Sequence, residues 1–178
     1  YATLYKCEVL KPDCSRCVSA RPELGCVWCG SSCGLDASCS GSGRVTLDSG
    51  LNCPGPVLAE VFPLSGPIEG NTTLAVMGTD IGRRFEDVLS VMVGNQPCDL
   101  DGLVLYYEIG ASVSCRTKSW NEGTELTELV TLQVRGADNM TQSSSGTVNF
   151  KYTDPKITGF VPRRGPQAGG TAVNVSGT

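Results

Sequence analysis

Residues 63–79 read PLSGPIEGNTTLAVMGT, and residues 162–178 read PRRGPQAGGTAVNVSGT. Both stretches contain the pattern Pro-x-x-Gly-Pro-x-x-Gly-x-Thr, followed by alternating apolar residues and Gly-Thr, at a constant offset of 99 residues. Matches in one register over this distance indicate tandem copies of one domain. We therefore expect one full copy over residues 57–154 and the start of a second, truncated copy over residues 155–178.

The first copy reads as a series of short strands, because apolar and polar residues alternate within them. Val130, Leu132 and Val134 should face a core in this way, and Leu89, Val91 and Val93 should share a face in another strand. The expected strands are residues 57–62, 72–78, 88–93, 111–116, 129–135 and 147–152. Six short strands in one domain, in a chain with 22 glycines and 10 prolines, predict an all-β sandwich of two sheets.

Cysteines divide the chain, since eight of the ten lie before the Pro54-Gly55-Pro56 linker. These eight are Cys7, Cys14, Cys17, Cys26, Cys29, Cys33, Cys39 and Cys53. Two CxxC pairs, residues 14–17 and 26–29, leave a four-cysteine zinc site open, but such a site would use only half of the cluster. The even number and the density favour four disulfides in a small domain over residues 1–56. Cys98 and Cys115 flank neighbouring strands and could form a fifth disulfide.

Three N-x-[ST] sequons begin at Asn71, Asn139 and Asn174. One such triplet carries little information, but three in a cysteine-rich chain favour an oxidising compartment and predict glycosylation. Asn174 is the least favourable acceptor, because it falls within an expected strand.

Composition excludes several functions. The chain has no histidine, which removes Ser-His-Asp, Cys-His and histidine–metal schemes, and we expect no catalytic residue, metal or cofactor. A net charge of -4 without a basic stripe argues against nucleic acid. No apolar run is long enough to cross a bilayer, so we expect no membrane insertion, and residues 1–6 lack the features of a signal peptide.

The motifs resemble two known families. The eight-cysteine block with Cys14-Ser15-Arg16-Cys17 and Cys26-Val27-Trp28-Cys29 is similar to the PSI domain of plexins, semaphorins and integrins. The stretches Val61-Phe62-Pro63-Leu64-Ser65-Gly66-Pro67 and Val93-Gly94-Asn95-Gln96-Pro97-Cys98 resemble the immunoglobulin-like IPT/TIG domain. A PSI module followed by tandem IPT/TIG domains is similar to plexins, with a leaning toward the B class, and to the hepatocyte growth factor receptor family.

The resemblance also implies how the cysteines of the PSI module pair, which their spacing alone leaves open. It implies a cysteine-knot-like module with the disulfides Cys7–Cys26, Cys14–Cys53, Cys17–Cys33 and Cys29–Cys39. It also implies that Trp28 is a core residue of this module.

The implied function is a non-catalytic stalk of a semaphorin receptor, in the ectodomain of a single-pass plasma-membrane protein. Other domains would bind semaphorin. This segment would contact neighbouring IPT domains, and it would space and orient the ligand-binding and signalling parts in cell guidance signalling. A receptor dimer or a co-receptor is the further partner that the resemblance implies. The alternative is a module of a growth-factor-receptor ectodomain, similar to the hepatocyte growth factor receptor, that binds a ligand or a co-receptor directly. Arg83, Arg84 and Phe85 would form that interface, against the simpler interpretation of a solvated loop with Phe85 turned inward.

Overall fold

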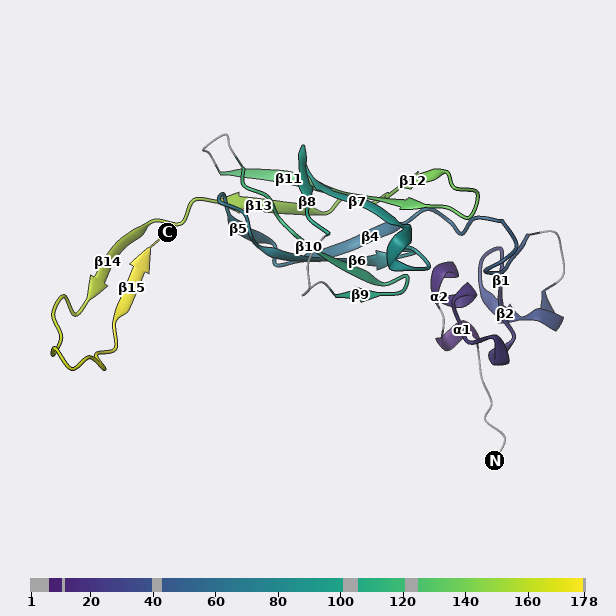
Figure 1. The fold of residues 1–178 in the computed structure, drawn as a ribbon, viewed down its shortest axis with the longest axis horizontal. Coiled ribbons are helices and arrows are strands. Elements are labelled where there is room, and N and C mark those ends of the chain that lie inside the picture. The colour runs from purple at the N-terminus through teal and green to yellow at the C-terminus, as the bar shows by residue number, and fades with distance from the viewer. Residues whose placement is uncertain (1–6, 11, 40–42, 101–105, 121–124, 178) are drawn as a thin grey trace, which may run out of the picture.

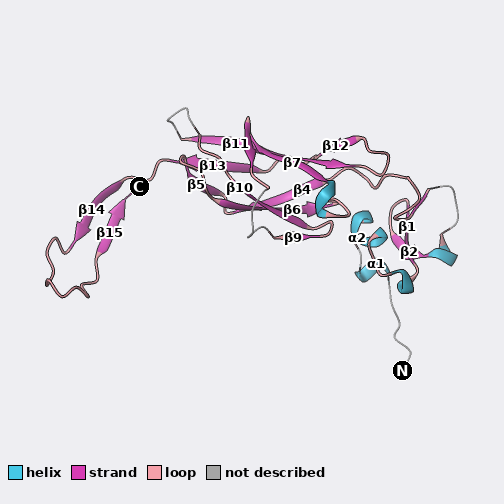
Figure 2. Ribbon diagram, in the orientation of Figure 1, coloured by secondary structure: helices cyan, strands magenta, loops and turns pink. Residues whose placement is uncertain are grey.

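The computed structural model describes residues 7–10, 12–39, 43–100, 106–120 and 125–177. Strands dominate and the few helices are short (Figure 2), which confirms the expected fold class. Three parts follow one another along the long axis (Figure 1). They are a cysteine-rich module (residues 7–53), a two-sheet sandwich (residues 56–153) and a C-terminal hairpin (residues 157–177).

The cysteine-rich module combines short helices with a small antiparallel sheet of order β2-β1-β3. Its elements are α1 (Cys7–Leu10), α2 (Cys14–Val18), the 3-10 helix η1 (Pro22–Leu24), β1 (Cys26–Cys29), β2 (Cys33–Leu35), the 3-10 helix η2 (Asp36–Ser38) and β3 (Arg44–Val45). Asp13 begins α2 as its N-cap, because its carboxylate accepts the Arg16 N–H at 2.8 Å. Trp28 is only 7% exposed and packs among the cysteines of the module core, as expected for a core residue.

The sandwich has one sheet of order β4-β6-β10-β9 and a second of order β5-β13-β11-β7-β8, with β12 added to β11. Its elements are β4 (Val57–Phe62), β5 (Ser65–Pro67), β6 (Thr73–Thr79), the 3-10 helix η3 (Phe85–Asp87), β7 (Val88–Val93), β8 (Gln96–Cys98), β9 (Tyr107–Glu108), β10 (Ser112–Arg116), β11 (Leu126–Arg135), β12 (Thr141–Ser143) and β13 (Asn149–Thr153). Neighbouring strands are antiparallel except β5, which runs parallel to β13.

The sandwich core is mostly aliphatic, with an aromatic cluster at one side. Val130, Leu132 and Val134 face this core from β11, as the alternation predicts. Tyr152 lies 5.1 Å from Phe150 and 5.5 Å from Trp120, measured between ring centroids. Aromatic residues therefore contribute more to the core than their low frequency suggests.

One predicted face is wrong in β7. Val88, Val91 and Val93 are buried there, whereas Leu89 is 36% exposed. The pairing with β11 shifts at this point, because Gln133 pairs with Ser90 but the next residue of β11 pairs with Val88. The bulge leaves Leu89 unpaired and reverses the alternation, which a strict period of two does not anticipate.

Other strands differ from expectation in extent. β11 begins at Leu126, three residues early, because its first part pairs with β13, where Leu126 lies opposite Tyr152. The short strands β5, β8, β9 and β12 were not expected, since two or three residues are too few to show alternation.

The repeated motif has the same local role in both copies. A Cβ atom on Gly66 would collide with the Thr72 hydroxyl, and one on Gly165 would collide with the Thr171 hydroxyl. Gly70 has a φ of +78°, and a side chain there would meet the backbone of Lys118. The glycines of the motif therefore let the backbone pass close to the threonine of the same motif and, at Gly70, to the loop that contains Lys118.

The C-terminal hairpin consists of β14 (Ile157–Val161) and β15 (Asn174–Gly177), which pair in an antiparallel manner. Its apolar side chains Ile157, Val173 and Val175 are 50–73% exposed. The positions of Val173 and Val175 in the first copy are Leu74 and Val76, which are fully buried.

Candidate inter-domain joint

All ten cysteines are paired within the structure, with none free. The disulfides are Cys7–Cys26, Cys14–Cys53, Cys17–Cys33, Cys29–Cys39 and Cys98–Cys115. In the module this arrangement is the one that the PSI resemblance implies, and each cysteine of the two CxxC pairs bonds outside its own pair. Their Cα atoms lie 5.5–5.7 Å apart, the usual separation for a disulfide.

A buried hydrogen bond connects the module to the sandwich. The Ser15 N–H at the start of α2 donates to Asp80 Oδ1 at 2.8 Å, across 65 positions of sequence. Asp80 follows β6, is 7% exposed and has a φ of +56°. Burial raises the pKa of the Asp80 carboxyl, and nearby Asp13 adds to this, while the bond from Ser15 and the charge of Arg16 oppose it.

Two further contacts complete this side of the joint. Ser19 Oγ donates to the Arg83 carbonyl at 3.2 Å. Gly110, with a φ of +69°, lies directly beneath α2, where a Cβ atom would approach Asp13 Oδ1 to 2.6 Å. Tyr107 supports the same loop by donating to the Gly82 carbonyl at 2.9 Å, and burial, with the charge of Asp87, raises the pKa of its phenol.

The linker forms the other side of the joint. Cys53 is bonded covalently to Cys14 in α2, and its carbonyl accepts a hydrogen bond from Gln142 Nε2 at 3.1 Å. Asn52 Nδ2 donates to Asp138 Oδ2 at 2.7 Å. Pro56 is fully buried, and its carbonyl accepts the Ser145 N–H at 2.9 Å. The linker is therefore bound to the β11–β12 end of the sandwich on both sides of its prolines.

The sequence identified the linker but missed the polar contacts of the joint. No motif or local pattern marks the residues that make these contacts, which are Asp80, Ser15 and Gly110. Only the fold brings them together. The one local signal was Asp13 ahead of Ser15, which is typical of a helix N-terminus and places α2 at the joint.

The expected interface residues have different environments. Arg83 forms an ion pair with Asp87 at 3.3 Å within the sandwich, and its side chain is 16% exposed. Arg84 is exposed. Phe85 is 38% exposed and packs edge-on against Tyr107 at 5.7 Å, so it is only partly turned inward. Arg83 thus belongs to the structure of the joint, and Arg84 and Phe85 remain as candidates for contact with a partner.

The three sequon asparagines are all exposed. Asn71 and Asn139 both have positive φ values in turns, and Asn71 Oδ1 accepts from Arg116 at 2.8 Å. Asn174 lies in β15 opposite Val161, on the face away from Val173 and Val175. The glycosylation predicted at these residues stays a prediction, but the strand itself does not bury Asn174.

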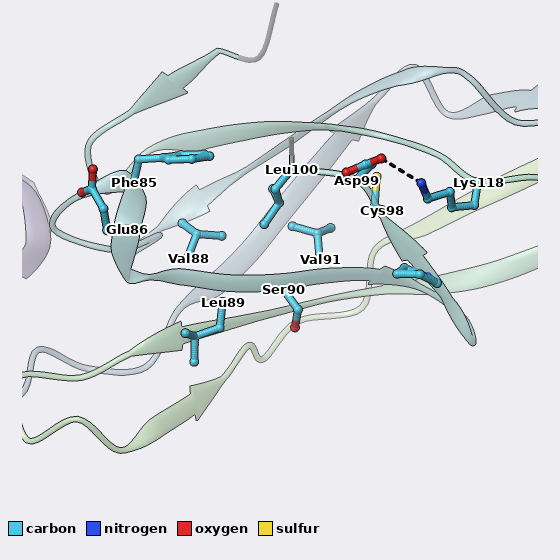
Figure 3. Close-up of a pocket in the computed structure, with 11 residues that line it drawn as sticks. Phe85, Glu86, Val88, Leu89, Ser90, Val91, Cys98, Asp99, Leu100 and Lys118 are labelled. Carbon is cyan, nitrogen blue, oxygen red and sulfur yellow. Dashed lines mark hydrogen bonds and ion pairs between the residues drawn. The ribbon is translucent and has the colours of Figure 1, made fainter. Parts of the chain in front are cut away.

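A groove with a volume of about 440 Å³ lies beside η3 and β7 (Figure 3). Val88, Val91 and Leu100 point into it, and the Asp99–Lys118 ion pair, at 2.7 Å, lies at one end. Val88 and Val91 are buried at the base of this groove, and the described lining residues contain no nucleophile–base pair.

The fold and its five disulfides place the chain in the class of disulfide-stabilised β proteins, with a two-sheet sandwich joined to a small cysteine-rich module. The IPT/TIG domain profile matches residues 56–152, more than half of the chain. The chain therefore belongs to the IPT/TIG domain family.

The whole chain is also homologous to plexins. It is 34% identical to human Plexin-B1 over 182 residues, which covers 100% of this chain and 8% of that protein. It is 36% identical to human Plexin-B3 over 181 residues, covering 99% of this chain and 9% of that protein. The chain thus spans less than a tenth of the length of these relatives. Both are plexins of the B class, which agrees with the class that the sequence motifs favour.

A solved structure of a plexin extracellular region has the same fold as the chain. The full extracellular region of Plexin A4 matches 98% of this chain with 26% identity and a TM-score of 0.81, and the match covers 18% of that chain. The segment is accordingly extracellular and part of a receptor ectodomain. Among the described helices, none has the length and apolar character needed to cross a membrane.

Proposed function

We propose that this segment is a non-catalytic stalk unit of a plexin-like receptor for semaphorins, which spaces and orients the ligand-binding and signalling parts. In this proposal residues 1–56 form a PSI module, residues 57–154 an IPT/TIG domain, and residues 155–178 the start of the next one. Semaphorin would bind other domains of the receptor, and the segment would contact its neighbouring IPT domains.

The joint is the observation that carries the proposal. The module contacts the sandwich through a buried bond from Ser15 to Asp80, a close approach at Gly110 and a linker that Gln142 holds. Contacts on both the α2 side and the linker side resist rotation about the linker, whereas a flexible tether would have neither. A stalk needs such a fixed angle, because a freely jointed segment would transmit no orientation.

The exposed face of the C-terminal hairpin supports a continuing array. Val173 and Val175 occupy the positions of the buried Leu74 and Val76 of the first copy. The remainder of a second sandwich would bury them in the same way. The join between the copies is short, since β13 ends at Thr153 and β14 begins at Ile157.

The test is a distance measurement across the joint. Nitroxide labels on non-canonical residues at the exposed positions Glu23 and Asn149 report on the module and the sandwich, without adding cysteines. Double electron–electron resonance on the full chain should give one narrow distance distribution. A broad distribution, like that of two domains on a tether, would disprove the stalk function while leaving the fold intact.

Direct binding by the sandwich is the second candidate, and the exposure of Arg84 and Phe85 favours it. Arg84→Glu reverses an exposed charge that has no role in the joint, so it is a better probe than Arg83→Glu. Cell-surface receptors that carry Arg84→Glu should signal normally in response to semaphorin if the segment acts only as a spacer. Loss of the response with normal surface expression would favour direct binding.

A further inference from the structure

The five disulfides differ in how far they are buried. The cysteines of Cys14–Cys53, Cys17–Cys33 and Cys98–Cys115 are all at most 9% exposed. Cys7 is buried and Cys26 packs against the module core. In Cys29–Cys39 both residues are partly buried, as Cys26 is, but neither belongs to that core. This is the disulfide in which neither cysteine is buried, so we expect an external thiol to reach it more readily than the other four.

The same disulfide closes the shortest loop. Its cysteines are 10 positions apart, whereas the others are separated by 16–39. A short loop restricts the unfolded chain least, so opening this disulfide should destabilise the fold less than opening any other. Cys29 and Cys39 also lie outside the joint, which uses Cys14–Cys53 and α2.

The surroundings of Cys29 favour its release as a thiolate. Arg44 lies directly opposite Cys29 in the pairing of β1 with β3, so the two side chains share one face of the sheet. Asp36 also pairs with the Arg44 guanidinium, at 2.8 Å. Both side chains are about half exposed, so solvent screens this ion pair and it neutralises the charge of Arg44 only in part. A neighbouring cation stabilises a thiolate and makes it a better leaving group.

The β2 side of Cys29 is closely packed. Gly34 in β2 has no side chain, and a Cβ atom there would approach both Cys29 Sγ and Ser38 Oγ to 3.2 Å. After opening, the Asp36 segment would still be held by the Arg44 ion pair and by the bond from the Asp36 N–H to the Gly25 carbonyl at 3.1 Å. Opening is thus a local event within a folded module.

We propose that Cys29–Cys39 is a redox modification site, opened selectively by a dithiol reductant of the small-molecule or thioredoxin-like class. One thiolate of the dithiol attacks Cys39 Sγ, the Cys29–Cys39 bond breaks, and its electron pair goes to Cys29 as a thiolate beside Arg44. The second thiolate of the reductant attacks the mixed disulfide and releases Cys39. The dithiol is oxidised to its disulfide, and its two electrons and two protons end on Cys29 and Cys39.

The test uses the full oxidised chain and dithiothreitol as the probe. Samples are quenched with N-ethylmaleimide at intervals, and alkylation of each cysteine is measured by peptide mass spectrometry while circular dichroism follows the fold. Cys29 and Cys39 should be labelled together, at least about tenfold faster than the buried pairs, before any loss of structure. Earlier labelling of another pair, or simultaneous opening of all five with unfolding, would overturn the proposal.

Two variants test the chemistry. Arg44→Gln should slow the opening of Cys29–Cys39 roughly two- to fivefold, because the leaving thiolate loses its cation. Arg135→Gln, an exposed arginine in the sandwich, is the matched control and should leave the rate unchanged. An unchanged rate in Arg44→Gln would remove Arg44 from the mechanism. The double variant Cys29→Ser with Cys39→Ser should remain folded and lack the fast phase, and unfolding of this variant would contradict the local nature of the event.

Discussion

Replacement of Asp80 by alanine should loosen the joint without unfolding either domain. The change removes the acceptor of the buried Ser15 N–H, which lies 2.8 Å from Asp80 Oδ1. A hydrogen bond to a charged group contributes roughly 1.5–3 kcal/mol. Alanine also tolerates the φ of +56° less well than aspartate does. Relief from burying the carboxylate offsets part of this loss, since burial disfavours the charged form.

The net expectation is a loss of about 2 kcal/mol of docking free energy, or roughly a 30-fold fall in the ratio of docked to undocked module. Double electron–electron resonance between labels at Glu23 and Asn149 should then show a second, broader component. Thermal unfolding of the sandwich should reflect only the backbone penalty of about 1–2 kcal/mol at the φ of +56°, because its core residues are not touched. An Asp80→Ala distance distribution identical to that of the unaltered chain would refute the idea that this bond fixes the joint.

Three further outcomes follow. The pKa of Asp80 is raised in the docked state, so the docked form binds a proton more readily than the undocked form. The joint should therefore become more stable as the pH falls from neutral through that raised pKa towards 3.8, which a narrower distance distribution would show. Asp80→Asn should abolish this pH dependence. Gly110→Ala should weaken the joint, because the new Cβ atom would collide with Asp13 at α2. Gly50→Ala is the control: it has a similar φ of +67° and no neighbour within 4 Å, so it carries only the backbone penalty of about 1–2 kcal/mol. Equal distance distributions in the two variants would count against a contact between Gly110 and α2. Replacing Cys98 and Cys115 by serine should lower the unfolding free energy of the sandwich by about 3 kcal/mol in urea, and an unchanged midpoint would show that the disulfide contributes little.

Local patterns predicted much of the sandwich. Alternation identified the inward face of β11, because this strand has one buried and one exposed side. It failed at Leu89, where a bulge depends on pairing with β11 and not on the residues of β7 alone. It could not detect β8 or β12, because three residues do not establish a period.

The joint depended on long-range geometry. The Pro54-Gly55-Pro56 linker was evident from its composition, yet the residues that hold it are distant in sequence. Gln142 reaches Cys53 across 89 positions, and Asp80 reaches Ser15 across 65. Nothing in the local sequence distinguishes these polar residues from others that make no contact between domains. The sequence therefore indicated where the domains meet but not which residues hold them together.

The parallel pairing at the two ends of the sandwich has a mechanical consequence. β5 runs parallel to β13, with the Lys151 N–H donating to the Leu64 carbonyl and the Ile68 N–H to the Thr153 carbonyl, each at 2.9 Å. Near the linker, Val57 and Ser145 form a parallel bridge, in which the Leu58 N–H donates to the Ser145 carbonyl at 2.9 Å. A pull applied along the chain at its two entry points would load these bonds in shear, so that they must yield together and not one after another. Such a domain should extend little under a pulling force.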